Sequence, residues 1–291
     1  MRVLAKYKNG NYEVTLFEDG TKIKTTQEET FVADHPDSID LKITDYCEND
    51  CPMCHENSSR SGRHGNLSHK IVDTFPSGME VAIGGGNPLS HPDLLPFLAR
   101  LKERGIIANV TVNLLDLLKN ESTVEALIDT EAVHGVGVSC AKYDERAVAF
   151  ALKHKNTVLH LINGVFPVED YQKMMGKGLK ILILGYKIFG RGVDFFSPSV
   201  VERMRRTKEC LGEILRGFKV VSFDNLAIEQ LDVKGAVGEA IFEQTYMGDD
   251  GEASMYVDLV KEEYALSSST AERAPLRDSL QACFENLPKK G

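Results

Sequence analysis

The sequence has no second pair of cysteines at C-x2-C spacing, no apolar run long enough to cross a membrane, and no low-complexity tract. A transmembrane helix needs about 20 consecutive apolar residues, so the chain is not expected to span a membrane. The opening segment Met1–Lys6 lacks the apolar core of a secretory signal. Six cysteines among 291 residues do not amount to a disulfide scaffold. We therefore expect a protein of the reducing cytoplasm.

An excess of positive charge is also absent. The formal net charge is −9, from 34 Lys and Arg residues against 43 Asp and Glu residues. This balance argues against a large basic surface for nucleic acid. One basic group, Arg203 to Lys208, is better explained as the solvated face of a helix. With 42% hydrophobic and 26% charged residues, the chain has the composition of a soluble globular protein.

Three cysteines are clustered. Cys47, Cys51 and Cys54 have C-x3-C-x2-C spacing and follow an alternating run, Ile39–Ile43, that predicts a strand with one apolar face. They therefore lie at the carboxyl end of a strand, where α/β sheets and barrels place their sites. Structural zinc is usually enclosed by four ligands, and the adjacent His55 fits poorly into one tetrahedron with Cys54. A [4Fe-4S] cluster held by three cysteines would instead leave one iron open to a small molecule.

Strand and helix patterns alternate after this motif. Six βα units in sequence imply parallel strands with helical crossovers, although periodicity does not distinguish an open sheet from a barrel. The predicted strands are Ile39–Ile43, Met79–Ile83, Ile106–Val112, Val133–Ser139, Thr157–Ile162 and Leu179–Leu184, with Phe218–Phe223 as one more. The predicted helices are Pro92–Arg104, Glu121–Ile128, Glu145–Lys153, Glu169–Met175 and Pro198–Leu215, preceded by a short one at Lys70–Phe75.

Two further segments flank this pattern. Residues 1–36 predict a small β meander, because Asn9–Gly10 and Asp19–Gly20 are turn dipeptides between short alternating runs. The core then covers residues 37–224. Residues 225–291 form an accessory segment, with strands expected at Ala240–Tyr246 and Met255–Lys261 and a final helix at Leu276–Leu287.

The cysteine spacing, together with the Gly84–Pro88 turn that ends the second strand, resembles the radical S-adenosylmethionine (radical SAM) superfamily, with no subfamily assigned. The resemblance covers about residues 38–190. It implies a partial (β/α)6 barrel in which Cys47, Cys51 and Cys54 bind a [4Fe-4S] cluster and SAM binds the open iron. It also implies reductive cleavage of SAM to methionine and a 5′-deoxyadenosyl radical that abstracts hydrogen from a substrate. An electron donor such as flavodoxin or ferredoxin would be needed.

The resemblance also suggests which residues contact SAM. Met53 stands where the family often has an aromatic residue near the adenine. Gly85 and Gly86 would meet the methionine amino group, and Asn87 replaces the usual Glu, so that it can accept a hydrogen bond but brings no charge. Further contacts are expected from residues at the ends of later strands, namely Asn113, Ser139, Ile162 and Gly185. Ile162 belongs to a stretch similar to a family G-x-I-x-G motif, with His160 at the first glycine.

Several residues keep two interpretations. Cys140 ends the fourth strand and is either a small buried residue or a catalytic thiol that returns a hydrogen atom to the substrate. His55 and Glu56 either order the cysteine loop or act on substrate protons. Arg191 either holds a carboxylate or phosphate group or lies in a surface turn.

The substrate is not specified by any motif. A peptide is our first expectation, and a nucleoside- or deazapurine-forming reaction on a small molecule is the second. Peptide modifiers often carry a cysteine-rich C-terminal extension, and only Cys210 and Cys283 remain in that part of the chain. A non-catalytic zinc or iron–sulfur binding module is the alternative from another class, and the glycine-rich turn after the second strand argues against it.

Overall fold

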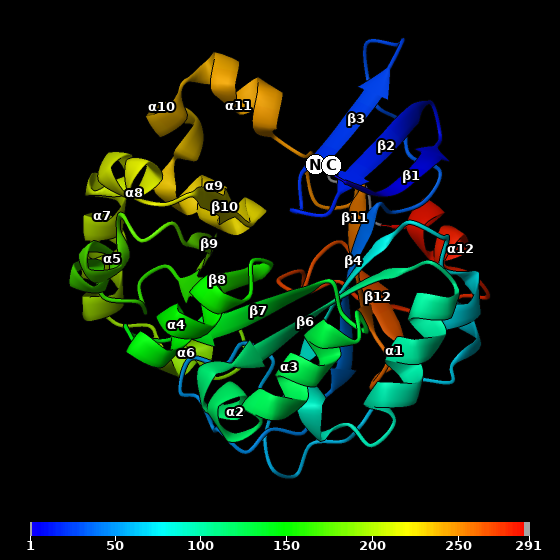
Figure 1. Ribbon diagram of the computed structural model, residues 1–291, viewed down its shortest axis with the longest axis horizontal. Coiled ribbons are helices and arrows are strands. Elements are labelled where there is room, and N and C mark those ends of the chain that lie inside the picture. Colours follow the sequence, from blue (N-terminus) through cyan, green and yellow to red (C-terminus); the bar gives the residue numbers. More distant parts are fainter. Residues whose placement is uncertain (1, 288–291) are drawn as a thin grey trace.

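The computed structural model describes residues 2–287 and contains two β-sheets (Figure 1). The smaller is antiparallel and consists of β1 (Val3–Asn9), β2 (Tyr12–Phe17) and β3 (Lys22–Thr26). Gly10 and Gly20 turn the chain between these strands with φ angles of +54° and +90°. Such angles are accessible to glycine without a steric penalty. The strands predicted for the N-terminal meander are confirmed.

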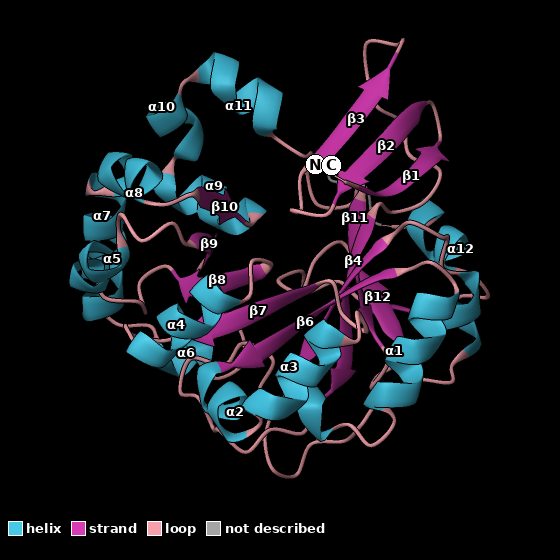
Figure 2. Cartoon of the chain, in the orientation of Figure 1, coloured by secondary structure: helices cyan, strands magenta, loops and turns pink. Residues whose placement is uncertain are grey.

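The larger sheet has ten strands, seven of which lie side by side in sequence order and run parallel. These are β4 (Ser38–Thr44), β5 (Glu80–Gly85), β6 (Ile107–Asn113), β7 (Gly135–Cys140), β8 (Thr157–Ile162), β9 (Lys180–Leu184) and β10 (Val220–Phe223). All seven were predicted from the sequence. Figure 2 shows the strands as an inner layer, flanked by the helices that connect them.

The strand β4 illustrates why the sheet has two unlike faces. Ile39, Leu41 and Ile43 are at most 1% exposed and belong to the main hydrophobic core with helix residues. The alternate residues Lys42 and Thr44 point to the opposite, inner face. The same alternation in the other parallel strands gives a core on the helix side and polar residues on the inner side.

The helices that follow the strands mostly match the prediction. They are α1 (Leu94–Glu103), α2 (Leu114–Lys119), α3 (Glu121–Asp129), α4 (Glu145–Lys153), α5 (Val168–Met174), α7 (Pro198–Glu209) and α8 (Leu211–Gly217). Lys70–Thr74 and Pro88–Ser90 are 3-10 turns, and α6 is a single turn at Gly192–Phe195. The predicted helix Pro198–Leu215 is divided at Cys210. The short α2 was missed because six residues are too few to show helical periodicity.

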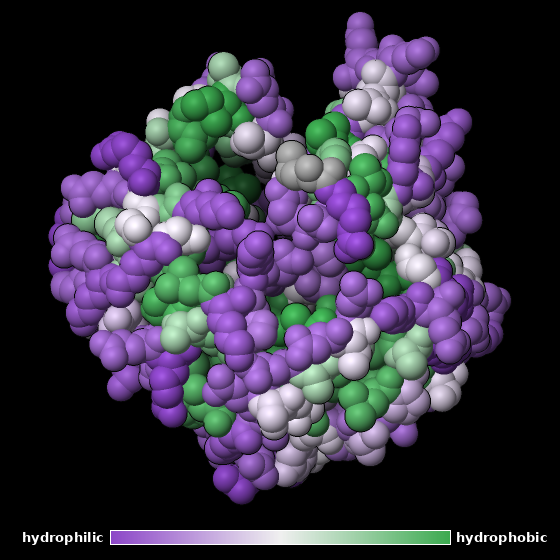
Figure 3. All heavy atoms as spheres, in the orientation of Figure 1, coloured by the Kyte–Doolittle hydropathy of each residue, from purple (hydrophilic) through white to green (hydrophobic). Residues whose placement is uncertain are grey.

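The C-terminal segment differs most from expectation. It begins with α9 (Asn225–Leu231) and α10 (Val233–Val237). The strand predicted at Ala240–Tyr246 is wrong: Glu239–Thr245 is a helix, α11. Within residues 2–287, α11 pairs with no strand, and its backbone groups are bonded within the helix. The Phe242 ring stacks on the Tyr246 ring one turn later, with 4.8 Å between the ring centroids. Figure 3 shows a hollow between these helices and the N-terminal sheet, with hydrophobic residues on the helix side.

The rest of this segment enlarges the core sheet. β11 (Ser254–Asp258), predicted as Met255–Lys261, pairs in parallel with β4, and β12 (Glu263–Ala265) and β13 (Ala274–Pro275) extend the edge in antiparallel fashion. The final helix, α12 (Leu280–Glu285), covers this end of the sheet (Figure 1). The sheet is therefore open within residues 2–287, with β10 and β13 as its two edges.

The α/β class with a mainly parallel sheet is confirmed. Within residues 2–287, none of the helices combines the length and apolar character that crossing a bilayer requires.

Candidate functional site

The three clustered cysteines lie on the loop that follows β4. Asp50, next to Cys51, has a φ angle of 44°, in the left-handed region. The Cys47 amide donates to the Ser59 carbonyl at 2.9 Å, and the Cys54 amide donates to the Cys51 carbonyl at 3.2 Å. Burial raises the pKa of the Cys47 and Cys51 thiols, so metal binding must displace their protons. The folded loop thus presents three partly exposed thiols.

A second loop fixes the cysteine loop from the end of β5. The amides of Gly86 and Asn87 donate to the carbonyls of Thr44 and Tyr46, both at 2.7 Å. A Cβ atom on Gly86 would lie 2.2 Å from the Tyr46 oxygen, so this approach requires glycine. Because these amides are engaged, the turn can offer a ligand its carbonyl oxygens, which suit an ammonium group. Asn87 Oδ1 accepts from the Leu89 amide at 3.1 Å and so caps the next turn.

Two of the predicted polar positions, Asn113 and Ser139, form one row with His160 on the inner face. Asn113 pairs with Ser139, and Ser139 pairs with His160, across β6, β7 and β8. The Asn113 amide lies 3.8 Å from the Cys51 sulfur, within reach of a hydrogen bond to sulfur. His160 lies over Gly137, where a Cβ atom would come within 2.3 Å of the ring. Burial lowers the pKa of His160 to about 4, so the ring is neutral at pH 7.

Cys140 does not join this row. It has the same parity as Val136 and Val138, is 6% exposed, and belongs to the main hydrophobic core. Its sulfur lies 3.6 Å from the Val138 carbonyl. Of the two interpretations of Cys140, these contacts support the small buried residue, with its side chain on the helix side of the sheet, and not the thiol that faces a substrate. The alternating apolar residues of β7 already carried this signal.

The positions expected near the adenine do come together. Met53 and Ile162 pack against a small cluster that contains Tyr186 and Val200. The neighbouring Gly185 amide is engaged, since it donates to Asp224 Oδ1 at 2.8 Å.

Two residues at α9 were missed by sequence reasoning. Asp224 caps this helix by accepting from the Ala227 amide at 2.8 Å. Gln230 accepts from the Tyr186 amide and donates to the Tyr186 carbonyl, both at 2.9 Å. Both residues form hydrogen bonds to the segment that follows β9. They lie about 40 residues further along the chain, so no local sequence pattern indicates this contact.

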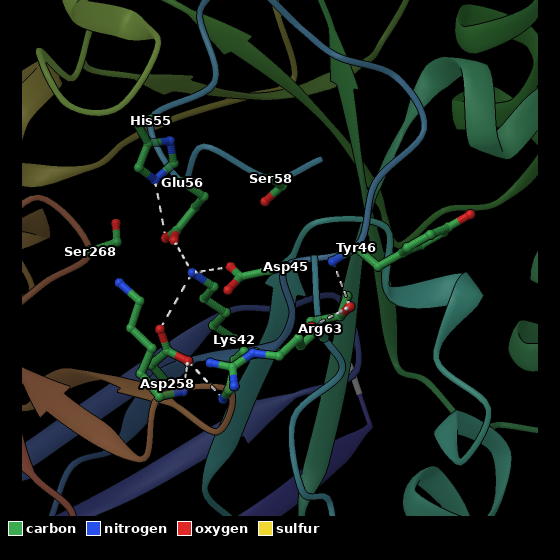
Figure 4. A network of polar contacts seen from close by, with 12 residues as sticks. Lys42, Asp45, Tyr46, His55, Glu56, Ser58, Arg63, Asp258 and Ser268 are labelled. Carbon is green, nitrogen blue, oxygen red and sulfur yellow. Dashed lines mark hydrogen bonds and ion pairs between the residues drawn. The ribbon is translucent and has the colours of Figure 1, made fainter. Parts of the chain in front are cut away.

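A buried ion network lies beside the cysteine loop (Figure 4). Lys42 Nζ is 2.6 Å from Asp45 Oδ1, 2.6 Å from Glu56 Oε2 and 3.4 Å from Asp258 Oδ2, and the lysine side chain is 3% exposed. Although burial opposes ionisation, His55 and Lys42 hold the pKa of Glu56 below its ordinary value. The carboxylates, Glu56 first among them, raise the pKa of Lys42. The network therefore joins β4, the cysteine loop and β11.

His55 and Glu56 belong to this network. The His55 Nε2 atom lies 3.5 Å from Glu56 Oε1, and the Tyr256 hydroxyl donates to the same oxygen at 3.1 Å. These contacts support the interpretation in which the two residues order the loop. Burial lowers the pKa of His55.

The donor set fits a polynuclear cluster. No group of three or more His, Cys, Asp or Glu side chains in residues 2–287 converges as a single metal ion requires. In a [4Fe-4S] cluster each cysteine binds a different iron, so its thiolates need not converge on one point. The three thiols lie on one fixed loop, with the Asn113 amide beside the Cys51 sulfur, and by their chemistry they suit the ligands of such a cluster.

The fold is shared with structures of SuiB from Streptococcus suis. A structure of SuiB bound to the precursor peptide SuiA matches with a TM-score of 0.58 and 15% identity, over 88% of this chain and 66% of SuiB. A structure of SuiB bound to S-adenosylmethionine matches with a TM-score of 0.55 and 14% identity, over 81% and 61% of the two chains.

This likeness is one of fold, and the chain spans less than two thirds of the length of SuiB. No protein-family model matches the chain, and no curated protein matches its sequence.

Proposed function

We propose that this protein is a radical SAM enzyme that binds a [4Fe-4S] cluster through Cys47, Cys51 and Cys54. The observation that carries the proposal is the cysteine loop itself, fixed at the carboxyl end of β4 by the Gly84–Asn87 turn and facing Asn113. The shared fold with SAM-bound SuiB supports it. On this proposal the open sheet is the partial (β/α)6 barrel of the superfamily.

Each part of the site has a role in this proposal. When bound, the cluster and SAM would supply a 5′-deoxyadenosyl radical that abstracts hydrogen from the substrate. The carbonyls of Gly85 and Gly86 accept from the methionine ammonium of SAM, with the Asn87 side chain beside them. The Ser139 hydroxyl on the inner row is a further polar contact, and Met53 packs against the adenine.

Other residues of this chain hold the adenine side of the site. Ile162, which packs against the same small cluster as Met53, would also contact the adenine. Because the Gly185 amide is engaged by Asp224, Gly185 contacts the adenine through its carbonyl.

We propose a peptide as the substrate class, because SuiB binds a precursor peptide and shares this fold. A small electron-transfer protein of the flavodoxin or ferredoxin type and a reducing cytoplasm complete the proposal.

The test is anaerobic reconstitution with iron and sulfide, followed by metal analysis. About four irons per chain are expected, the content of one cubane. The triple Cys→Ala variant of Cys47, Cys51 and Cys54 should bind none, and the control Cys210→Ala should match the parent. With dithionite and SAM, the parent should release methionine and 5′-deoxyadenosine. Zinc in place of iron, or a cluster retained by the triple variant, would refute the proposal.

A further inference from the structure

Arg191 follows β9 in the sequence but reaches back to the cysteine loop. Its Nε donates to the Cys51 carbonyl at 2.9 Å, and its Nη2 donates to the Ser58 carbonyl at 2.9 Å. Nη1 lies 3.4 Å from Asn57 Oδ1. The Arg191 backbone amide donates to the Cys54 carbonyl at 3.1 Å. One residue thus makes four contacts with residues 51–58.

The glycines on either side allow this approach. A Cβ atom on Gly190, whose φ angle is +52°, would lie 2.8 Å from the Cys54 carbonyl and 2.7 Å from the His55 carbonyl. A Cβ atom on Gly192 would lie 2.5 Å from the Lys187 carbonyl. Gly190 is therefore required by the close contact of this segment with the cysteine loop, and Gly192 by the tight turn of the segment itself. Arg191 has a different role from both of its sequence interpretations.

The guanidinium suits this place for two reasons. Its planar array of N–H groups satisfies several carbonyl oxygens at fixed angles, which a lysine ammonium does not reproduce. It also places a permanent positive charge beside a cysteine that would carry a negatively charged cluster. Charge and hydrogen bonding around such clusters set their reduction potential.

We propose that Arg191 is a positioning residue that locks the cysteine loop to the end of β9, and so fixes the cluster against the adenine side of the SAM site. The effect of Arg191 on the cluster rests on the proposed function. The effect of Arg191 on the structure of the cysteine loop does not depend on the metal.

The first arm of the test is hydrogen exchange on the full chain before reconstitution. Residues 47–59 contain hydrogen-bonded amides: those of Cys47 and Cys54 bond within this range, and that of Ser59 donates to the Asp45 carbonyl. In Arg191→Met their exchange should accelerate about tenfold or more, because each charge-assisted bond that is lost contributes at least that factor. The control Arg203→Met removes a comparable bond, from Arg203 Nε to the Gly164 carbonyl at 2.7 Å, and should leave residues 47–59 unchanged.

The second arm uses the reconstituted protein. Arg191→Met should lose iron to a chelator faster than the parent, and its cluster should have a more negative midpoint potential, since the reduced cluster loses a nearby positive charge. Its electron paramagnetic resonance spectrum should respond less to added SAM. Arg191→Lys should recover much of the potential but little of the exchange protection, which separates charge from hydrogen-bond geometry.

The outcomes are distinguishable. The inference is overturned if Arg191→Met matches the parent in three measurements: hydrogen exchange of residues 47–59, loss of iron to the chelator, and midpoint potential of the cluster. If the parent itself assembles no cluster, the proposed function fails, while the exchange arm still decides whether Arg191 locks the loop. If Arg191→Met does not fold, as judged by circular dichroism, Arg191→Lys provides the hydrogen-exchange comparison, and exchange like the parent's would then overturn the inference.

Discussion

Replacement of Lys42 by methionine should strongly destabilise the protein. The lysine side chain is 3% exposed and lies within 3.4 Å of three carboxylates, those of Asp45, Glu56 and Asp258 (Figure 4). Methionine retains most of the volume but leaves these charges without their cation. Removing one partner of a buried ion pair typically costs about 3–5 kcal/mol. Asp258 is 2% exposed and Glu56 13% exposed, so solvent relieves little of that cost.

The assay is urea unfolding at pH 7, compared with a matched surface variant. Lys70 pairs with Asp278, but their side chains are 68% and 92% exposed, so Lys70→Met should leave the free energy of unfolding unchanged within error. Adding Glu56→Gln to Lys42→Met should restore part of the lost stability, because it removes one uncompensated charge. Equal unfolding free energies for Lys42→Met and Lys70→Met would refute this reasoning.

The pH dependence gives an independent check. The pKa of Glu56 is lowered in the folded protein, so its contribution is present above the ordinary value of 4.5 and is lost as the pH falls further. The pKa of Lys42 is raised, so its contribution is present below 10.5 and is lost at higher pH. The difference in free energy of unfolding between the parent and Lys42→Met should therefore be constant between pH 4.5 and pH 10.5 and should become smaller on both sides. A difference in unfolding free energy that grows as the pH falls below 4.5 would contradict the role given to Glu56.

Three further predictions concern the site. Gly86→Ala should cost about 1–3 kcal/mol in urea unfolding and weaken SAM binding, because its Cβ would meet the Tyr46 carbonyl at 2.2 Å. A Cβ atom on Gly84 has nothing within 4 Å, so the control Gly84→Ala should keep the parent's free energy of unfolding, and equal losses of stability in the two variants would contradict this account. Cys140→Ala should lose about 1 kcal/mol and keep the parent's rate of SAM cleavage and its product, whereas a changed product would return Cys140 to the site. Gln230→Ala should lower stability by about 2 kcal/mol through its two bonds to Tyr186 and raise the Kd for SAM, and an unchanged thermal midpoint would count against that role.

The sequence was informative wherever the determinant is local. Alternation in Ile39–Ile43 and its counterparts identified the parallel strands, because a buried face requires an apolar residue at every second position. The C-x3-C-x2-C spacing and the Gly84–Asn87 turn were assigned to strand ends from their neighbours alone. Cys140 alternates in step with Val136 and Val138 in the sequence, which already indicates that its thiol lies on their buried face.

Local patterns failed in the C-terminal segment. Ala240–Tyr246 has the residue types of a strand, but a strand needs an edge to pair with, and pairing is a property of the whole sheet. The chain found no such edge there and formed α11 instead. Ser254–Asp258 did find one, beside β4, and became part of the core sheet.

Only the tertiary structure decided which charged side chains serve the cysteine loop. Lys42 and Asp258 are far apart in the chain and meet because β11 pairs with β4. Arg191 meets Cys51 because the two loops follow strands whose carboxyl ends face the same side. A lysine or arginine in a turn has the same local pattern whether it is solvated or buried against a carbonyl. The free energy that separates these states comes from partners brought together by folding.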